Sequence, residues 1–208
     1  MRGGRTNILV LGSGGHSGVL IDILEQLDVE LLGILDNSRK IGSKCFGLEV
    51  IGNDDYIDNF SHEEVILVNG IGSLPGRQER WLISEKFREK RFEFMTLVHP
   101  NASLTNNISI GNGVQIMNGS VVQHGTHIGC DSIINTGSII DHNCTIGNSC
   151  HIAPGTVLSG GVTIGNNVHI GTGSCIIQNI KIGDNVTVAA GSVIYKDIEP
   201  NTRYILGK

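Results

Sequence analysis

Aromatic side chains are scarce in this 208-residue chain, which contains one Trp, three Tyr and five Phe, or 4% of its residues. Large aromatic side chains supply much of the buried area in thick globular cores. Glycine, by contrast, is abundant, with 29 residues. This combination predicts a thin body filled by branched aliphatic side chains rather than one thick core.

The chain also lacks any apolar run near the roughly 20 residues that span a bilayer. Residues 1–7 lack the apolar region of a signal peptide. We therefore expect a cytoplasmic protein without a membrane span. The formal net charge of −5 argues against non-specific binding to nucleic acid or to an anionic membrane.

Cysteine usage argues against a disulfide framework. The five cysteines are an odd number, and none belongs to a Cys-x-x-Cys pair. In a cytoplasmic protein this pattern is typical of reduced thiols that act as small hydrophobic residues. It also does not match the ligand spacing of a zinc site, so we expect no metal.

Residues 1–97 alternate short apolar runs with helical patterns, which indicates a parallel α/β sheet. The run at 8–11 is apolar throughout, as in a strand buried on both faces. The expected strands cover 8–11, 31–35, 65–68 and 92–98, and the expected helices cover 19–27 and 75–90.

A glycine-rich turn, residues 12–18, follows the first expected strand and opens the first helix. Its backbone N–H groups suit a phosphate or pyrophosphate, although a purely structural tight turn is the alternative. The dinucleotide pattern G-x-G-x-x-G would need Gly at the position of Ser17, and 97 residues hold little more than one mononucleotide half. Asp36 ends the second strand, where a ribose-binding acid can sit. His16 either donates to phosphate or caps the helix.

From residue 98 onward an aliphatic residue recurs at every sixth position, which is the period of the hexapeptide β-helix. Three hexapeptides form a coil, so residues 18 apart are expected to stack at the spacing of neighbouring strands. The series, here called the aliphatic ladder, comprises Val98, Leu104, Ile110, Ile116, Val122, Ile128, Ile134, Ile140, Ile146, Ile152, Leu158, Ile164, Ile170, Ile176, Ile182, Val188 and Ile194.

Each hexapeptide also has rules at its other positions, counted from the ladder residue i. Position i+4 is small or β-branched nearly throughout, which fits the inside of a narrow prism. Gly, Asn and Asp are frequent at i+1 to i+3, where we expect the left-handed backbone that tight corners require.

Histidines are the candidate chemical groups of the repeats. His124 and His142 are 18 apart, as are His151 and His169, so each pair is expected to stack on one edge. An imidazole suits proton transfer at neutral pH. The alternatives are polar corner residues without a chemical role, or a metal site, for which partners at matching offsets are few.

These features together resemble a known family, the bacterial sugar O- and N-acyltransferases of the sialic acid O-acetyltransferase and bacillosamine N-acetyltransferase type. The resemblance covers nearly the whole chain. It rests on the glycine-rich turn with His16 and on three further motifs, at residues 97–100 (Leu-Val-His-Pro), 138–144 (Ser-Ile-Ile-Asp-His-Asn-Cys) and 151–155 (His-Ile-Ala-Pro-Gly).

The resemblance implies a Rossmann-like domain over residues 1–97 that holds a nucleotide sugar. It implies a left-handed parallel β-helix over residues 98–208 that holds acetyl-CoA as co-substrate. It further implies a homotrimer with active sites between neighbouring β-helices.

The resemblance also implies residue roles. His142 would be the general base, flanked by Asp141 and by Asn143, which stands where some relatives carry Glu and others Asp. The residues implied to contact acetyl-CoA are His151, Gly160, Thr172 and Ala190. Those implied to contact the nucleotide sugar are Ser13, Gly14, Gly15, His16, Asp36 and Gly72.

The expected activity is acetyl transfer from acetyl-CoA to the amino group of a nucleotide-linked sugar, a UDP-4-amino sugar, for surface glycan biosynthesis. One alternative is O-acetylation of a sialic-acid-like sugar. Another is a non-catalytic trimeric assembly protein of such a pathway. A fourth hypothesis, NAD-linked chemistry on the N-terminal domain, is weakened by Ser17 and by the short sheet.

Overall fold

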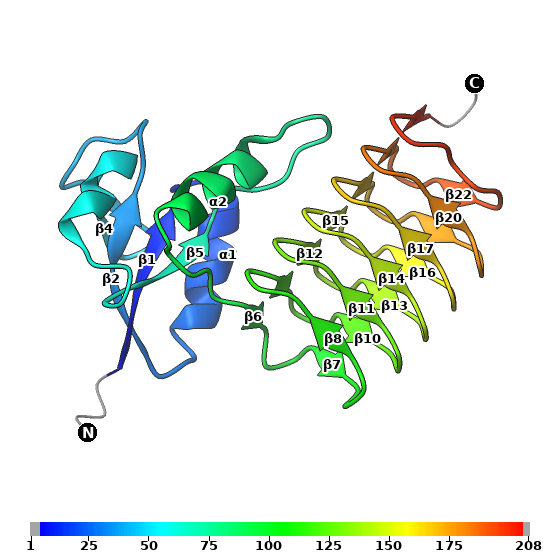
Figure 1. The fold of residues 1–208 in the computed structure, drawn as a ribbon. Coiled ribbons are helices and arrows are strands. Elements are labelled where there is room, and N and C mark those ends of the chain that lie inside the picture. Colours follow the sequence, from blue (N-terminus) through cyan, green and yellow to red (C-terminus); the bar gives the residue numbers. More distant parts are fainter. Residues whose placement is uncertain (1–4, 206–208) are drawn as a thin grey trace. The chain divides into compact units, whose positions relative to one another are not determined.

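The computed structural model describes residues 5–205, which form two compact units (Figure 1). The first comprises the chain up to Ser73 together with Arg77–Met95. The second comprises Leu74–Gly76 and the chain from Thr96 onward. Each unit has its own hydrophobic core.

The first unit is built on a five-stranded sheet with the order β3-β4-β2-β1-β5. The pairs β1–β2, β1–β5 and β2–β4 are parallel, whereas β3 and β4 form an antiparallel hairpin. The predicted parallel α/β sheet is therefore confirmed. The strands are β1 (Thr6–Leu11), β2 (Val29–Leu35), β3 (Lys44–Cys45), β4 (Leu48–Gly52) and β5 (Ile66–Asn69).

The β3–β4 hairpin was not predicted from the sequence. Its two turn residues, Phe46 and Gly47, both have positive φ, 51° and 81°. Two-residue hairpin turns of this geometry normally carry Asn-Gly or Asp-Gly, and a Phe at the first position hides the signal. The strand predicted at 92–98 was wrong in the opposite sense, because Phe94 makes only an isolated bridge to Leu67 of β5.

Three helical segments complete the first unit: α1 (Gly15–Leu24), the 3-10 helix η1 (Asp54–Asn59) and α2 (Glu79–Glu89). The predicted helix at 75–90 was wrong at its start, since Gly76 has a φ of 73°, which no right-handed helix accommodates. Phe87 of α2 packs in one buried cluster with Leu9 and Leu11 of β1 and with Leu67 of β5.

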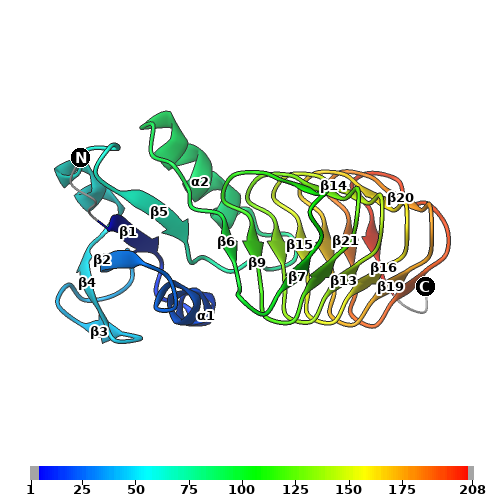
Figure 2. The ribbon, with the colours of Figure 1, turned by 90° about the horizontal axis from the view of Figure 1, so that it is seen from below.

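The second unit is a parallel β-helix of two-residue strands stacked in three sheets, here called faces 1, 2 and 3 in chain order (Figure 2). Face 1 contains β6 (Leu97–Val98), β9 (Gln115–Ile116), β12 (Ile133–Ile134), β15 (His151–Ile152), β18 (His169–Ile170), β21 (Thr187–Val188) and β23 (Arg203–Tyr204). Face 2 contains β7 (Ser103–Leu104), β10 (Val121–Val122), β13 (Ile139–Ile140), β16 (Val157–Leu158), β19 (Cys175–Ile176) and β22 (Val193–Ile194). Face 3 contains β8 (Ser109–Ile110), β11 (His127–Ile128), β14 (Thr145–Ile146), β17 (Thr163–Ile164) and β20 (Lys181–Ile182).

The period of 18 is confirmed along the faces. Val121 pairs with Ile139, and Ile139 pairs with Val157. Every ladder side chain from Ile116 to Ile194 is at most 2% exposed, so the ladder forms the core. The last pairing departs from the period, because Thr187 pairs with Arg203, 16 residues on.

Position i+4 is buried as predicted, and its hydroxyl groups find partners inside the prism. Ser132 donates to the carbonyl oxygen of Gly147 at 2.8 Å, and Ser138 donates to that of Ala153 at 3.0 Å. Each acceptor lies 15 residues on, in the next coil. A buried hydroxyl without such a partner would destabilise the fold, so these bonds let small polar residues share the core with the ladder.

The prediction of left-handed backbone at i+1 to i+3 was too broad. Positive φ, between 55° and 73°, occurs at i+3 of every hexapeptide from Gly113 to Gly191. The glycines at i+1 meet a different constraint, the close approach of the next coil. A Cβ atom added to any of them would lie 2.3–2.7 Å from its nearest neighbour; they are Gly111, Gly129, Gly147, Gly165, Gly171 and Gly183.

All five cysteines are free thiols, and Cys144 and Cys150 are buried in the β-helix core. Burial raises the pKa of the Cys150 thiol to about 12. Between residues 5 and 205 no helix is long and apolar enough to cross a membrane.

Gly147→Ala tests the spacing constraint between coils. Its Cβ would lie 2.5 Å from the carbonyl oxygen of Gly165, which is backbone and cannot move aside. We expect the free energy of unfolding in urea to fall by about 1–3 kcal/mol. Gly137→Asn is the matched control, because Gly137 has a φ of 66°, which Asn tolerates, and open space around its Cα. Equal losses in the two variants would contradict the constraint.

Candidate active site

The first unit has a pocket of about 430 Å³ at the carboxyl edge of its sheet. In an open parallel sheet this edge is where ligands bind. Residues at the ends of β1, β2 and β5 meet there with one side of α2. The lining residues are Leu11, Gly12, Leu35, Asp36, Asn37, Ser38, Asp54, Ile71, Glu79, Leu82, Ile83 and Lys86.

Asp36 holds the loops at this edge together. Its Oδ2 accepts hydrogen bonds from the N–H and hydroxyl groups of Ser13, at 2.7 and 2.6 Å. Its Oδ1 accepts from the N–H and hydroxyl groups of Ser38, both at 2.7 Å, and from the N–H of Arg39 at 3.1 Å. Partial burial alone would raise the pKa of Asp36, but the bonds from Ser13 and Ser38 outweigh it and hold the pKa at about 2.

Ser17 explains the departure from the dinucleotide pattern. Its side chain is fully buried, and its hydroxyl lies 2.6 Å from the carbonyl oxygen of Gly12 and 3.0 Å from that of Gly70. The hydroxyl therefore ties the loop after β1 to the loop after β5. A glycine at this position would leave both carbonyl groups without this donor.

The N-terminus of α1 opens toward free space. The N-cap is Gly14, without a side-chain capping bond, and a Cβ on Gly14 or Gly15 would meet no atom within 4 Å. His16 is the second helical residue, so the helix-capping interpretation of His16 was wrong. A Cβ on Gly72 would lie 3.6 Å from the His16 Cβ, which brings the loop after β5 to the same place.

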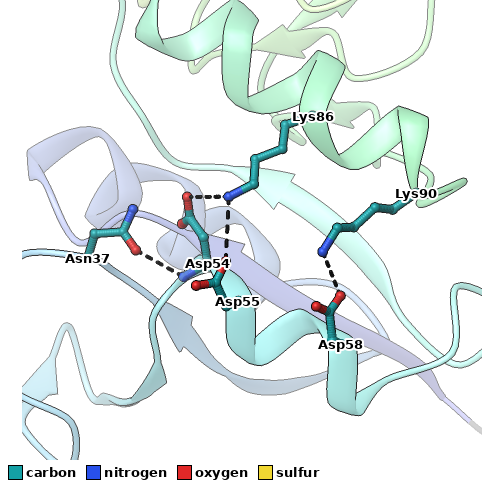
Figure 3. Close-up of polar contacts among 6 residues, drawn as sticks. All are labelled: Asn37, Asp54, Asp55, Asp58, Lys86 and Lys90. Atoms are coloured by element: carbon teal, nitrogen blue, oxygen red, sulfur yellow. Dashed lines mark hydrogen bonds and ion pairs between the residues drawn. The ribbon is translucent and has the colours of Figure 1, made fainter.

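Two lysines of α2 bind the acidic 3-10 helix η1 (Figure 3). Lys86 Nζ lies 3.3 Å from Asp54 and 3.9 Å from Asp55, and Lys90 Nζ lies 2.6 Å from Asp58. Lys86 and Asp54 both line the pocket. Sequence reasoning missed them, because 32 residues separate the two and no local motif links them.

Asn37 belongs to the same group. Its Oδ1 accepts the N–H of Asp54 at 3.0 Å (Figure 3), and its side chain also lines the pocket. The signal that was available for Asn37 is its place directly after Asp36 at the end of β2.

On the β-helix, His142 lies in the turn between faces 2 and 3 and is exposed. The Asp141 Oδ1 accepts the backbone N–H of His142 at 2.7 Å. The Asn143 Nδ2 lies 3.2 Å from His142 Nδ1. Asn143 has a φ of 57°, the left-handed conformation of position i+3, which Asn tolerates better than most residues.

Gly160 stacks one coil beyond His142. A Cβ at Gly160 would lie 2.5 Å from both Cε1 and Nε2 of the imidazole. Only a residue without a side chain therefore leaves this edge of the ring in place. The N–H of Gly161 donates to the carbonyl oxygen of His142 at 2.9 Å and fixes the two turns to each other.

His151 and His169 stack on face 1, as the period of 18 predicted, with ring centroids 4.9 Å apart and an edge-to-face geometry. They lie in strands rather than at a corner. The His151 Nε2 lies 3.0 Å from Asn135 Nδ2. His169 Nδ1 is buried without a hydrogen-bond partner among residues 5–205, and burial lowers the pKa of His169.

A second pocket, of about 370 Å³, lies within the β-helix unit beside face 1. It contains two of the residues implied to contact acetyl-CoA, Thr172 and Ala190, but not His151 or Gly160. One chain thus places His142 with Gly160 at one corner, and Thr172 with Ala190 at another. The lining residues are Pro75, His169, Gly171, Thr172, Thr187, Val188, Ala189, Ala190, Arg203, Tyr204 and Ile205. In the part of the chain described here, no group of three or more His, Cys, Asp or Glu side chains is placed to hold a metal ion.

Two family models match the chain. The PglD N-terminal domain matches residues 7–82, and the bacterial transferase hexapeptide model, of six repeats, matches residues 125–160 and 161–196. No curated protein sequence matches.

Solved structures match along nearly the whole length. The acetyltransferase domain of PglB from Neisseria gonorrhoeae, solved with acetyl coenzyme A, is 32% identical, with 96% of each chain covered and a TM-score of 0.88. PerB from Caulobacter crescentus, solved with CoA and GDP-perosamine, is 28% identical, with 95% of this chain and 92% of that chain covered and a TM-score of 0.87. WeeI from Acinetobacter baumannii, at 20% identity and a TM-score of 0.84, shows the fold alone.

An α/β sheet followed by hexapeptide coils, with this likeness over both units, defines an acyltransferase of the hexapeptide-repeat class. The chain belongs to the sugar N-acyltransferase family that joins a PglD-type N-terminal domain to a left-handed parallel β-helix. The family resemblance and the fold class expected from the sequence are both confirmed.

Asp36→Asn tests the role of this carboxylate in the first unit. Because the folded pKa, about 2, lies below the ordinary value of 3.8, Asp36 adds stability above pH 4 that is lost as the pH falls toward 2. We expect the difference in unfolding free energy between wild type and Asp36→Asn to shrink between about pH 4 and pH 2, measured in urea. Asp28→Asn, in an exposed ion pair with Arg5, is the control. A difference that stays constant over this window would refute the assignment.

Proposed function

We propose that the protein transfers the acetyl group of acetyl-CoA to the amino group of a nucleotide-linked sugar, with His142 as general base. The observation that carries this proposal is an exposed imidazole whose Nε2 edge lies against Gly160, a position without a side chain. Two similar proteins support it, the PglB domain solved with acetyl coenzyme A and PerB solved with CoA and GDP-perosamine.

The pocket of the first unit is the proposed nucleotide site. Ile71, Leu82 and Ile83 offer apolar walls for a base, and Asn37 and Lys86 offer polar groups at its edge. The diphosphate is proposed to lie at the N-terminus of α1, where free N–H groups and the helix dipole favour an anion. We propose the implied set Ser13, Gly14, Gly15, His16, Asp36 and Gly72 as its surroundings, with Asp36 acting mainly by fixing Ser13.

The proposed chemistry needs one proton acceptor. The sugar amine attacks the carbonyl carbon of the thioester, and as the C–N bond forms its proton moves to His142. The C–S bond then breaks, and the sulfur of CoA leaves and takes that proton. Asp141 is proposed to fix the turn that holds the base. The residues proposed to contact acetyl-CoA are His151, Gly160, Thr172 and Ala190.

Face 2 supports the proposal of a homotrimer. Its outward side chains form an apolar row in register, Val121, Ile139, Val157, Cys175 and Val193. Ile139 is 42% exposed and Val193 is 54% exposed. Face 3 carries polar residues at the same positions, among them Thr163 and Lys181. A second copy packed near face 2 would bring another chain's pocket toward His142, which a single chain does not do.

A substrate panel with wild type and His142→Ala tests the proposed activity. We expect acetylation of UDP-4-amino sugars, with GDP-4-amino sugars and a sialic-acid-like sugar as the competing acceptors. His142→Ala is expected to lower kcat by about 10²–10⁴-fold, since it removes the general base, and to bind acetyl-CoA normally by calorimetry. Activity within a few-fold of wild type would rule out His142 as base. Failure of the wild type to bind acetyl-CoA would favour a non-catalytic assembly protein.

Val193→Asp tests the trimer without touching the coil that carries His142. Three carboxylates buried without partners in a trimer interface cost several kcal/mol each, so we expect a shift to monomers in sedimentation at micromolar concentration. Thr163→Asp on face 3 is the control and should keep the wild-type mass. A Val193→Asp protein that keeps the wild-type oligomeric mass would show that face 2 is not the interface.

A further inference from the structure

The two ring nitrogens of His142 have different surroundings. Nδ1 faces the side-chain amide of Asn143, 3.2 Å away. Nε2 lies at the ring edge that Gly160 leaves free of side-chain atoms. A substrate amine therefore reaches Nε2, while Nδ1 is reserved for Asn143.

The nearest carboxylate has another task. Asp141 uses its Oδ1 to accept the backbone N–H of His142 at 2.7 Å. Among the described residues, the polar contact of the His142 ring is the amide of Asn143. His124, at the same corner one coil earlier, has its own Nε2 at 3.2 Å from Asn107 Nδ2. Gly160, one coil later, adds no charge.

A neutral imidazole carries one N–H. For Nε2 to accept a proton, Nδ1 must hold the N–H and needs an acceptor beside it. An amide oxygen is such an acceptor, and a half-turn of the amide exchanges its O and N, which X-ray maps and models alike assign only from the contacts. The Oδ1 of Asn143 lies beside Gly125, where no side chain opposes the exchange.

We propose that Asn143 is a positioning residue that accepts the Nδ1–H of His142 through Oδ1 and thereby keeps Nε2 as the proton acceptor. This inference rests on the proposed role of His142 as base. An amide selects the tautomer as a carboxylate does, but it brings no negative charge to the imidazolium. The base then gives up its proton without a carboxylate holding it.

The backbone makes the test clean. Position i+3 has a left-handed φ of 57° at Asn143, and the same corner position is Gly in the neighbouring coils, at Gly125 and Gly161. Asn143→Gly therefore removes the amide without backbone strain. Asn179→Gly, with a φ of 61° at the same corner one coil beyond Gly161, is the matched control. Asn143→Asp keeps the acceptor and adds a charge.

Nitrogen-15 NMR of the labelled full-length protein reads the tautomer directly, with the His142 signals identified by their loss in His142→Gln. We expect the Nδ1–H tautomer in wild type, in Asn143→Asp and in Asn179→Gly. Asn143→Gly is expected to populate the Nε2–H form and to lower kcat about 10- to 100-fold with KM changed less than threefold. Asn143→Asp should retain activity and move the acidic limb of kcat/KM to higher pH by about one unit or more, since an opposite charge favours the imidazolium.

An Nε2–H tautomer in wild type, or an Asn143→Gly protein with unchanged tautomer and kcat, would overturn the inference. These outcomes are separate from a failure of the proposed function. If His142→Ala remains active, the base is misassigned whatever the tautomer. If His142→Ala is inactive while Asn143→Gly matches Asn179→Gly, His142 stands as base and Asn143 does not position it.

Discussion

The stacking of coils at the spacing of neighbouring parallel strands, about 4.8 Å, is the constraint on which the second unit depends. It admits one aliphatic side chain per face and coil, small residues beside it, and glycine where Gly147 meets the backbone of Gly165. It also sets the candidate site. Gly160 can lie against the imidazole of His142 only because the two are one coil apart, so the spacing that builds the core also places the ring.

The aliphatic ladder made the β-helix predictable, because a period of six matches neither an isolated helix nor an ordinary strand. The positions of His142, Gly160, His151 and His169 followed from the period of 18. The failures were local. Gly76 stops the expected helix at its first turn, and Phe46 hides a hairpin turn. The left-handed corners were expected at three positions and occupy one, because sequence counts do not separate glycine used for φ from glycine used for close approach.

The two carboxylates of the candidate site, Asp36 and Asp141, illustrate what sequence position does not contain. Each stands where a ligand or a catalytic partner is expected, and each spends hydrogen-bonding capacity on backbone N–H groups of its own loop. Lys86 and Asp54, by contrast, line the pocket without a local motif. Such assignments need the geometry of side chains from distant segments, which composition and spacing do not supply.

The unbroken ladder between residues 98 and 194 has a consequence for how such a chain can change over generations. Loss or gain of a single residue inside a coil would rotate every later position and turn the aliphatic side chains outward. Loss or gain of 18 residues would restore each face, each corner and each stacked partner. Length in this unit is therefore inherited in whole coils, whereas point substitutions at its outward positions remain free to alter what it binds.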